Sequence, residues 1–153
     1  MTIKLTRLFL IFFVVFKLNA QSNLTSNQEK ISNSLISYFN LERENIHLHL
    51  NKKTYLTNEE IWFKGYIIEN KNKTPYIETT NVYLELIDEN NKKIFSQLCF
   101  ADNSIFEGHF KLNKTIKTGR YFIKVFTNFM NNFSEDESSI FNVTIINPTD
   151  DNN

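Results

Sequence analysis

Most of the chain alternates apolar and polar residues with a period of two, which is typical of strands with one buried face. Seven such runs lie between Glu44 and Ile146, separated by turn-rich segments. Seven short alternating strands predict an all-β fold, a seven-stranded antiparallel immunoglobulin-like β-sandwich. The fourth run, "KKIFSQLCF", alternates less regularly than the others. The other six predict these inward residues: Ile46, Leu48 and Leu50; Ile61, Phe63 and Ile67; Val82, Leu84 and Leu86; Phe106, Phe110 and Leu112; Tyr121, Ile123 and Val125; and Phe141, Val143 and Ile145.

A helical pattern precedes the strands. Ser26 and Glu29 have the spacing of a capping box. Apolar residues then recur on one face of a helix, at Ile31, Leu35, Tyr38 and Phe39. This spacing predicts one short amphipathic helix from about 27 to 39, within an N-terminal helical segment of residues 21–43.

The first twenty residues have the features of a signal peptide. Lys4 and Arg7 precede the apolar run "LFLIFFVVF", and Ala20 supplies a small residue at a cleavage site. The run is shorter than the roughly 20 residues that span a bilayer. We therefore expect cleavage after residue 20, export to the periplasm or cell surface, and no transmembrane segment in the mature chain. The sandwich domain is expected at residues 44–147, with a polar tail at 148–153.

The charge balance excludes some partners. Residues 1–20 hold three of the 17 basic side chains and none of the 17 acidic ones, so the mature chain has a formal charge of about −3. Nucleic acids and anionic membranes are bound by basic surfaces. The composition therefore favours protein partners or neighbouring envelope domains, and no nucleic acid.

Four segments, in order, resemble a known domain. "IHLHLNKKTYLTNEEIWFKGYI", "VYLELID", "GHFKL" and "TGRYFIKVFTNFMNNF" are similar to the strands and strand exit of macroglobulin-like domains of the MG2 type. Such domains occur in α-macroglobulins and in Bacteroidota cell-envelope proteins related to TonB-dependent receptors. The resemblance covers about Glu44 to Ile146. It implies a macroglobulin-type sandwich that serves as a non-catalytic docking or structural module in the bacterial cell envelope.

The sequence also departs from that family. Asn51, Lys52 and Lys53 replace the family's Asp-Lys-Pro, and "TNEE" lacks the usual glycine. Cys99 lies in "LCFAD" and not in the Cys-Gly-Glu-Gln thioester that covalent protease trapping requires. The alternative function is therefore a protease-binding, inhibitor-like module without a thioester.

Candidate chemical groups are sparse. His47 and His49 share one strand face and could hold a zinc ion, but a zinc site needs three or four ligands, so surface histidines are favoured. "SEDES", residues 134–138, could bind calcium, but a solvated loop is favoured. We find no catalytic motif, and we expect no enzyme activity, cofactor or metal. Cys99 is expected to be a buried thiol, and Gly119 with Tyr121 fits a tyrosine corner.

Alternation also predicts an interaction surface. If the third and sixth runs are neighbours in one sheet, their outward residues lie together on a face that is normally polar. Trp62 and Tyr66 also point outward, on the other sheet. Either the N-terminal helix covers the first face with Ile31, Leu35 and Phe39, or the face is free for docking. The candidate interaction surface comprises Tyr83, Ile87, Phe122, Phe126, Trp62 and Tyr66.

Overall fold

The computed structural model describes residues 26–150, which fall into two units that meet between Leu41 and Glu42. The first unit contains a helix at residues 26–39, which confirms the helix predicted from the apolar spacing. No helix within residues 26–150 has the length and apolarity to cross a membrane. The predicted signal peptide, residues 1–20, and the end of the predicted polar tail lie outside the described residues.

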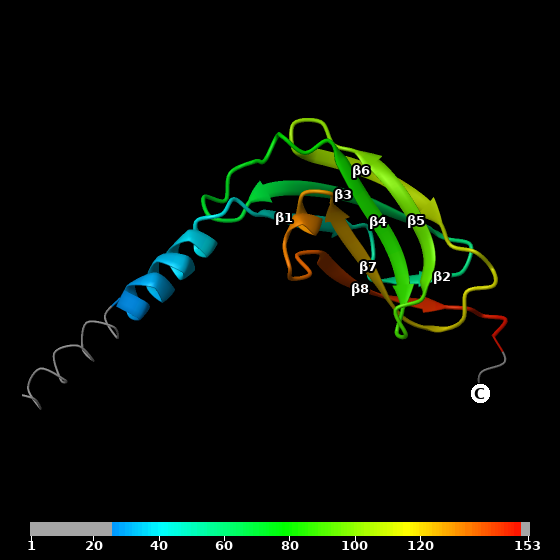
Figure 1. Ribbon diagram of the computed structural model, residues 1–153. Helices are drawn as coiled ribbons and strands as arrows, with labels where there is room; N and C mark the ends of the chain where they lie inside the picture. The colour runs from blue at the N-terminus through cyan, green and yellow to red at the C-terminus, as the bar shows by residue number, and fades with distance from the viewer. Residues whose placement is uncertain (1–25, 151–153) are drawn as a thin grey trace, which may run out of the picture. The chain divides into compact units, whose positions relative to one another are not determined.

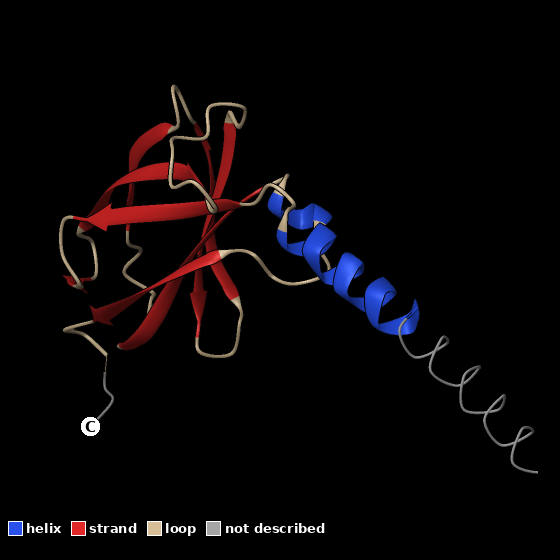
Figure 2. Cartoon of the chain, turned by 90° about the vertical axis from the view of Figure 1, so that its left-hand side faces the viewer, coloured by secondary structure: helices blue, strands red, loops and turns tan. Residues whose placement is uncertain are grey.

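The second unit is a sandwich of two sheets (Figures 1 and 2). One sheet has the strand order β1-β3-β6, and the other has the order β2-β8-β7-β4-β5. A short 3-10 turn, η1, spans Met130–Asn132 after β7. The strands are β1 Glu44–Leu50, β2 Thr54–Leu56, β3 Glu60–Glu69, β4 Asn81–Asp88, β5 Lys93–Phe100, β6 Ile105–Lys111, β7 Gly119–Thr127 and β8 Ser139–Ile146.

The strand number and the pairing differ from the prediction of seven antiparallel strands. β2 is an eighth strand, and it pairs with β8 in parallel. The connection at residues 51–53 carries the chain from the three-stranded sheet to the five-stranded one, where Tyr55 is buried. The Tyr55 hydroxyl donates to Asn51 Oδ1 at 2.7 Å and fixes this crossing. A strand of three residues is too short to show a period of two, so the pattern missed it.

The core lies between the sheets and is formed mainly by the predicted inward faces, together with Tyr55, Ala101, Ile116 and Met130. Ile61, Leu84 and Ile123 are fully buried, and their neighbours along each strand point outward. Three of the predicted inward residues on β1 and β8 are only partly buried against the core: Leu48, Leu50 and Phe141. The alternation of the sequence therefore predicts the buried faces correctly.

The predicted tyrosine corner is present at the start of β7. The Tyr121 hydroxyl donates to the backbone carbonyl of Lys117 at 2.9 Å, which is the upstream bond that defines such a corner. Burial raises the pKa of the Tyr121 hydroxyl. The bond anchors the connection before β7 and sets where the strand begins.

Polar contacts fasten the loop between β7 and β8 to the start of β1. The buried carboxylate of Glu44 accepts hydrogen bonds from the hydroxyls of Thr79 and Thr127. Arg43 forms an ion pair with Glu137, and its guanidinium lies over the Phe133 ring at 4.4 Å. These contacts join segments that are far apart in sequence at one end of the sandwich.

Candidate interaction surfaces

The outer face of the five-stranded sheet carries four of the predicted surface residues. β4 and β7 pair antiparallel, with Tyr83 opposite Phe126 and Ile87 opposite Phe122. The rings of Tyr83 and Phe126 are stacked, with centroids 5.3 Å apart and planes 16° apart. The structure therefore brings these four residues together in the predicted register.

Their exposure is uneven. Tyr83, Phe122 and Phe126 are half-buried, whereas Ile87 is 8% exposed. The pairing of β4 with β5 shifts between Leu86 and Ile87 and places Lys93 opposite Ile87. Ile87 therefore adds little to the accessible surface of this face.

Two ion pairs involve charged residues of this face. Glu85 pairs with Lys93 at 2.8 Å, and Lys124 pairs with Asp136 at 2.8 Å. The Lys124 ammonium also lies 5.8 Å from the centroid of the Phe126 ring. The charges on the face are thus matched within the chain, and its remaining binding capacity is mainly aromatic and apolar.

The most exposed apolar residues of this face were not in the predicted set. Leu98 of β5 lies opposite Tyr83 and is 58% exposed, and Phe100 lies opposite Asn81 and is 71% exposed. Leu98, Tyr83 and Phe126 form one row across three strands. The sequence did contain a pattern that could have identified them, because Leu98 and Phe100 alternate with the inward Gln97 and Cys99. The irregular alternation at the start of that strand prevented this prediction.

Trp62 and Tyr66 lie on the other sheet and face away from the core. Trp62 is 50% exposed and stacks on His109 with centroids 4.2 Å apart. Tyr66 contacts the His49 ring edge-on at 5.7 Å. The structure therefore splits the six predicted residues between the two outer faces of the sandwich, and they do not form one surface.

The paired histidines lie where the alternation placed them, on the outer face of β1. His47 is opposite Tyr66 and His49 is opposite Lys64, so a ring and an ammonium face them across the strand pair. Glu44 is turned inward and bonded to threonine hydroxyls. Nowhere in residues 26–150 do three histidine, cysteine or acidic side chains come together as a metal site.

The acidic loop "SEDES" is engaged by basic residues of the chain. Asp136 accepts from the Lys124 ammonium and from the backbone N–H of Ser138, and Glu137 pairs with Arg43. The Lys124 bond, assisted by Ser138, lowers the pKa of Asp136 to about 2. These carboxylates attach the loop to Lys124 of β7 and to Arg43, just before β1.

Cys99 is buried between the sheets, as expected from the sequence. Burial raises the pKa of its thiol, so the reactive thiolate is disfavoured. The side chain packs in the hydrophobic core as a small apolar group.

Comparison with known proteins identifies the fold. The sequence matches no protein-family model and no curated protein. The structure is similar to trypsin-activated alpha-2-macroglobulin from Escherichia coli, with a TM-score of 0.55 and 13% identity over 67% of this chain and 6% of that one. The elastase-activated E. coli protein gives a TM-score of 0.56 at 13% identity, over 67% of this chain and 8% of that one. Salmonella alpha-2-macroglobulin reacted with methylamine gives a TM-score of 0.54 at 13% identity, over 67% of this chain and 6% of that one.

The chain therefore corresponds to a small part of those long proteins. At 13% identity the similarity concerns the backbone arrangement and not shared side-chain chemistry. The chain has a macroglobulin-like β-sandwich fold.

Proposed function

We propose that this chain is a non-catalytic, exported macroglobulin-like module of the MG2 type, which docks a protein partner in the cell envelope of a bacterium such as a member of the Bacteroidota. The fold, the resemblance in four ordered segments and the signal-like residues 1–20 support this proposal. The observation that carries it is the apolar outer face of the five-stranded sheet, with Leu98 and Phe100 at its edge.

The face has the composition of a protein-binding surface. Interfaces are enriched in aromatic residues at the centre and are bordered by polar groups. Here the stacked Tyr83 and Phe126 lie beside the exposed Leu98, and the Glu85–Lys93 ion pair lies next to them. A sheet face of this composition suits a folded neighbouring domain of an envelope protein as its partner.

Site-specific cross-linking tests the docking face. A photoreactive residue at position 98 or 100, in the chain expressed by its own host, should yield one discrete cross-linked protein. The same residue at position 111, on the outer face of β6, is the control and should not. The partner, once purified, should bind the Phe100→Ser variant more weakly than the wild type. Equal cross-linking at all three positions would remove the support for this face.

The N-terminal helix is the competing cover for the same face. If Ile31, Leu35 and Phe39 cover it, Phe122→Ser should destabilise the monomer. If the face is free, this change at the half-buried Phe122 should cost less, and the same change at the exposed Phe100 should alter the free energy of unfolding by no more than about 0.5 kcal/mol, as surface substitutions usually do. Urea unfolding of the wild type and both variants separates these outcomes.

The absence of catalysis is part of the proposal. Hydrolytic assays with the purified chain should show no turnover. A reproducible activity that disappears on changing a single residue would overturn the non-catalytic assignment.

A protease-binding role is the second candidate. Two of the similar proteins are described as activated by trypsin and by porcine elastase. Without a thioester, this chain would bind a protease only non-covalently. Incubation with a panel of proteases followed by size-exclusion chromatography tests this role, and the absence of both a complex and inhibition ends it.

A further inference from the structure

β8 is only partly paired on the edge away from β7. β2 pairs there with Thr144, Ile145 and Ile146, and the Thr144 N–H donates to the carbonyl of Lys53 at 2.9 Å. Backbone groups of successive strand residues point to opposite edges. The backbone groups of Ile140 and Asn142 therefore point to the same edge as those of Thr144. Within residues 26–150, no strand pairs with Ile140 or Asn142 on that side.

A second unpaired edge faces the first. β1 is the outermost strand of the three-stranded sheet. The Ile46 N–H donates to Ser139 Oγ at 3.3 Å, which shows that even-numbered residues of β1 turn their backbone groups toward β8. By the same alternation, those of Leu48 and Leu50 point toward the space between the strands.

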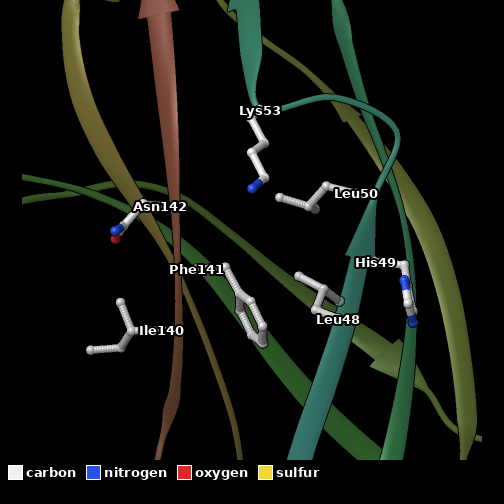
Figure 3. Close-up of a pocket in the computed structure, with 7 residues that line it drawn as sticks. All are labelled: Leu48, His49, Leu50, Lys53, Ile140, Phe141 and Asn142. Carbon is white, nitrogen blue, oxygen red and sulfur yellow. The ribbon is translucent and has the colours of Figure 1, made fainter.

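A groove of about 480 Å³ separates these two edges. Figure 3 shows Leu48 and Phe141 pointing toward each other from β1 and β8, with Leu50 beside them. His49, Ile140 and Asn142 point away from this interior and form its rims. The groove therefore has an apolar floor and unpaired backbone groups along both walls.

One cation reaches into the groove. The Lys53 side chain extends from the connection before β2 toward Leu50 (Figure 3). None of the residues that line the groove is acidic, and no carboxylate of residues 26–150 lies within ion-pair distance of Lys53. Other lysines of the sandwich do have such partners: Lys52, Lys64, Lys93 and Lys124.

We propose that this groove receives an extended, acidic peptide segment of a partner protein as an added strand. Its backbone pairs with the free edge of β8 at Ile140 and Asn142. Alternate apolar side chains of the peptide enter the floor between Leu48 and Phe141, and a neighbouring carboxylate pairs with Lys53. Strand addition of this kind takes affinity from main-chain hydrogen bonds and specificity from the pockets for alternate side chains.

The segments at the two ends of the given sequence do not have the pattern of a suitable strand. Residues 1–20 contain no acidic side chain, and residues 21–25 contain one apolar residue, Leu24. Residues 148–153 are acidic, but Pro148 is their one apolar residue. Neither segment combines alternating apolar side chains with a carboxylate, and the proposed occupant is a segment of another protein. The site lies at the edge of the sandwich, so its failure would leave the docking face of the five-stranded sheet untouched.

Peptide binding tests the proposal. The probe is an acetylated and amidated synthetic peptide in which valine alternates with threonine, with one central threonine replaced by glutamate. Titrated into the full chain labelled with ¹⁵N, it should shift the backbone amide signals of Leu48, Lys53, Ile140 and Asn142, and leave those of Leu98 and Phe100 unchanged. A peptide with proline next to the glutamate should bind more weakly, because it lacks one strand N–H.

Charge reversal supplies the sharper comparison. Lys53→Glu should weaken binding of the glutamate peptide by about tenfold or more, and it should favour the same peptide with lysine in place of glutamate. Lys111→Glu, on the outer face of β6, carries the same change in net charge and should bind like the wild type. The proposal is overturned if the glutamate peptide does not bind, if both variants bind it equally, or if the shifts map to the outer sheet face. Shifts that depend on protein concentration without peptide would assign the groove to a second copy of the chain instead.

Discussion

Gly65 of β3 lies directly opposite Phe106 of β6, and the Phe106 ring occupies the space that a side chain at position 65 would need. The neighbouring pair is arranged the other way round, with Phe63 opposite Gly108. A β-carbon on Gly108 would lie 2.8 Å from the Phe63 ring, closer than such contacts occur. Glycine and phenylalanine thus alternate across the two strands, and each ring fills the space above a glycine.

Gly65→Ala should therefore destabilise the sandwich. The added methyl group overlaps a buried ring, and overpacking of this kind typically costs about 1–3 kcal/mol. Gly119→Ala is the matched control, because a β-carbon there meets its nearest atom, in the Tyr121 ring, at an ordinary 3.7 Å. The control should stay within about 0.5 kcal/mol of the wild type in urea unfolding.

A double-mutant cycle locates the cause. In a Phe106→Leu background, the shorter side chain leaves room for the methyl group, so Gly65→Ala should cost less than it does alone. An equal cost in both backgrounds would show that the Phe106 ring is not the obstacle.

Tyr121→Phe tests the tyrosine corner. The change removes the hydroxyl that donates to the Lys117 carbonyl. It should lower the free energy of unfolding by about 1 kcal/mol, the usual net contribution of a hydrogen bond to stability. Tyr83→Phe, on the outer face of β4, removes a hydroxyl without such a bond in the described part of the chain and should change stability by less than about 0.5 kcal/mol. Equal unfolding free energies for the two variants would contradict a structural role for this bond.

The sequence predicted the buried faces well because a strand with one face in a core must alternate. Val82, Leu84 and Ile123 follow that rule, and their outward neighbours do too. The same rule placed Tyr83 beside Phe126, once β4 and β7 were assumed to be neighbours. The tyrosine corner was predictable because a tyrosine near the start of a strand is a local signal.

Features set by tertiary geometry could not be predicted from the sequence. β2 is too short to carry a period, and its parallel pairing depends on a crossing between sheets. Ile87 is buried at the point where the pairing of β4 with β5 shifts, and no alternation encodes that shift. The groove beside Lys53 exists because β2 ends the pairing of β8 after three residues.

Cys99 should react slowly with thiol reagents in the folded protein. Its side chain is buried and burial raises the pKa of the thiol, so modification requires the sandwich to open. In denaturing urea the reaction should be fast. A control places a cysteine at the exposed position 96 of the same strand, as Ser96→Cys in a Cys99→Ala background, and this thiol should react at once. Rapid labelling of native Cys99 would show that the β5 edge opens readily.

The pairing of Lys124 with Asp136 should make stability depend on pH in a defined window. Hydrogen bonds from Lys124 and Ser138 hold the pKa of Asp136 at about 2, below its usual value of 3.8. A carboxyl whose folded-state pKa is lowered stabilises the fold above the unfolded pKa, and this contribution is lost as pH falls through the folded value. The contribution is therefore complete above about pH 5 and decreases between about pH 4 and pH 2.

Asp136→Asn should show this loss directly. Its side chain is 62% exposed, so solvent screening limits the expected cost at pH 7 to about 0.2–1 kcal/mol. The difference in unfolding free energy between wild type and variant should shrink as pH falls from 5 toward 2, because protonation then removes the same charge from the wild type. Urea unfolding at several pH values in low salt measures it. Glu107→Gln is the control at pH 7, since Glu107 meets Lys64 only at 3.7 Å and is more exposed, so its effect on the free energy of unfolding should be smaller. A difference at Asp136 that stays constant from pH 5 to pH 2 would assign the effect of the substitution to the Ser138 turn and not to the charge.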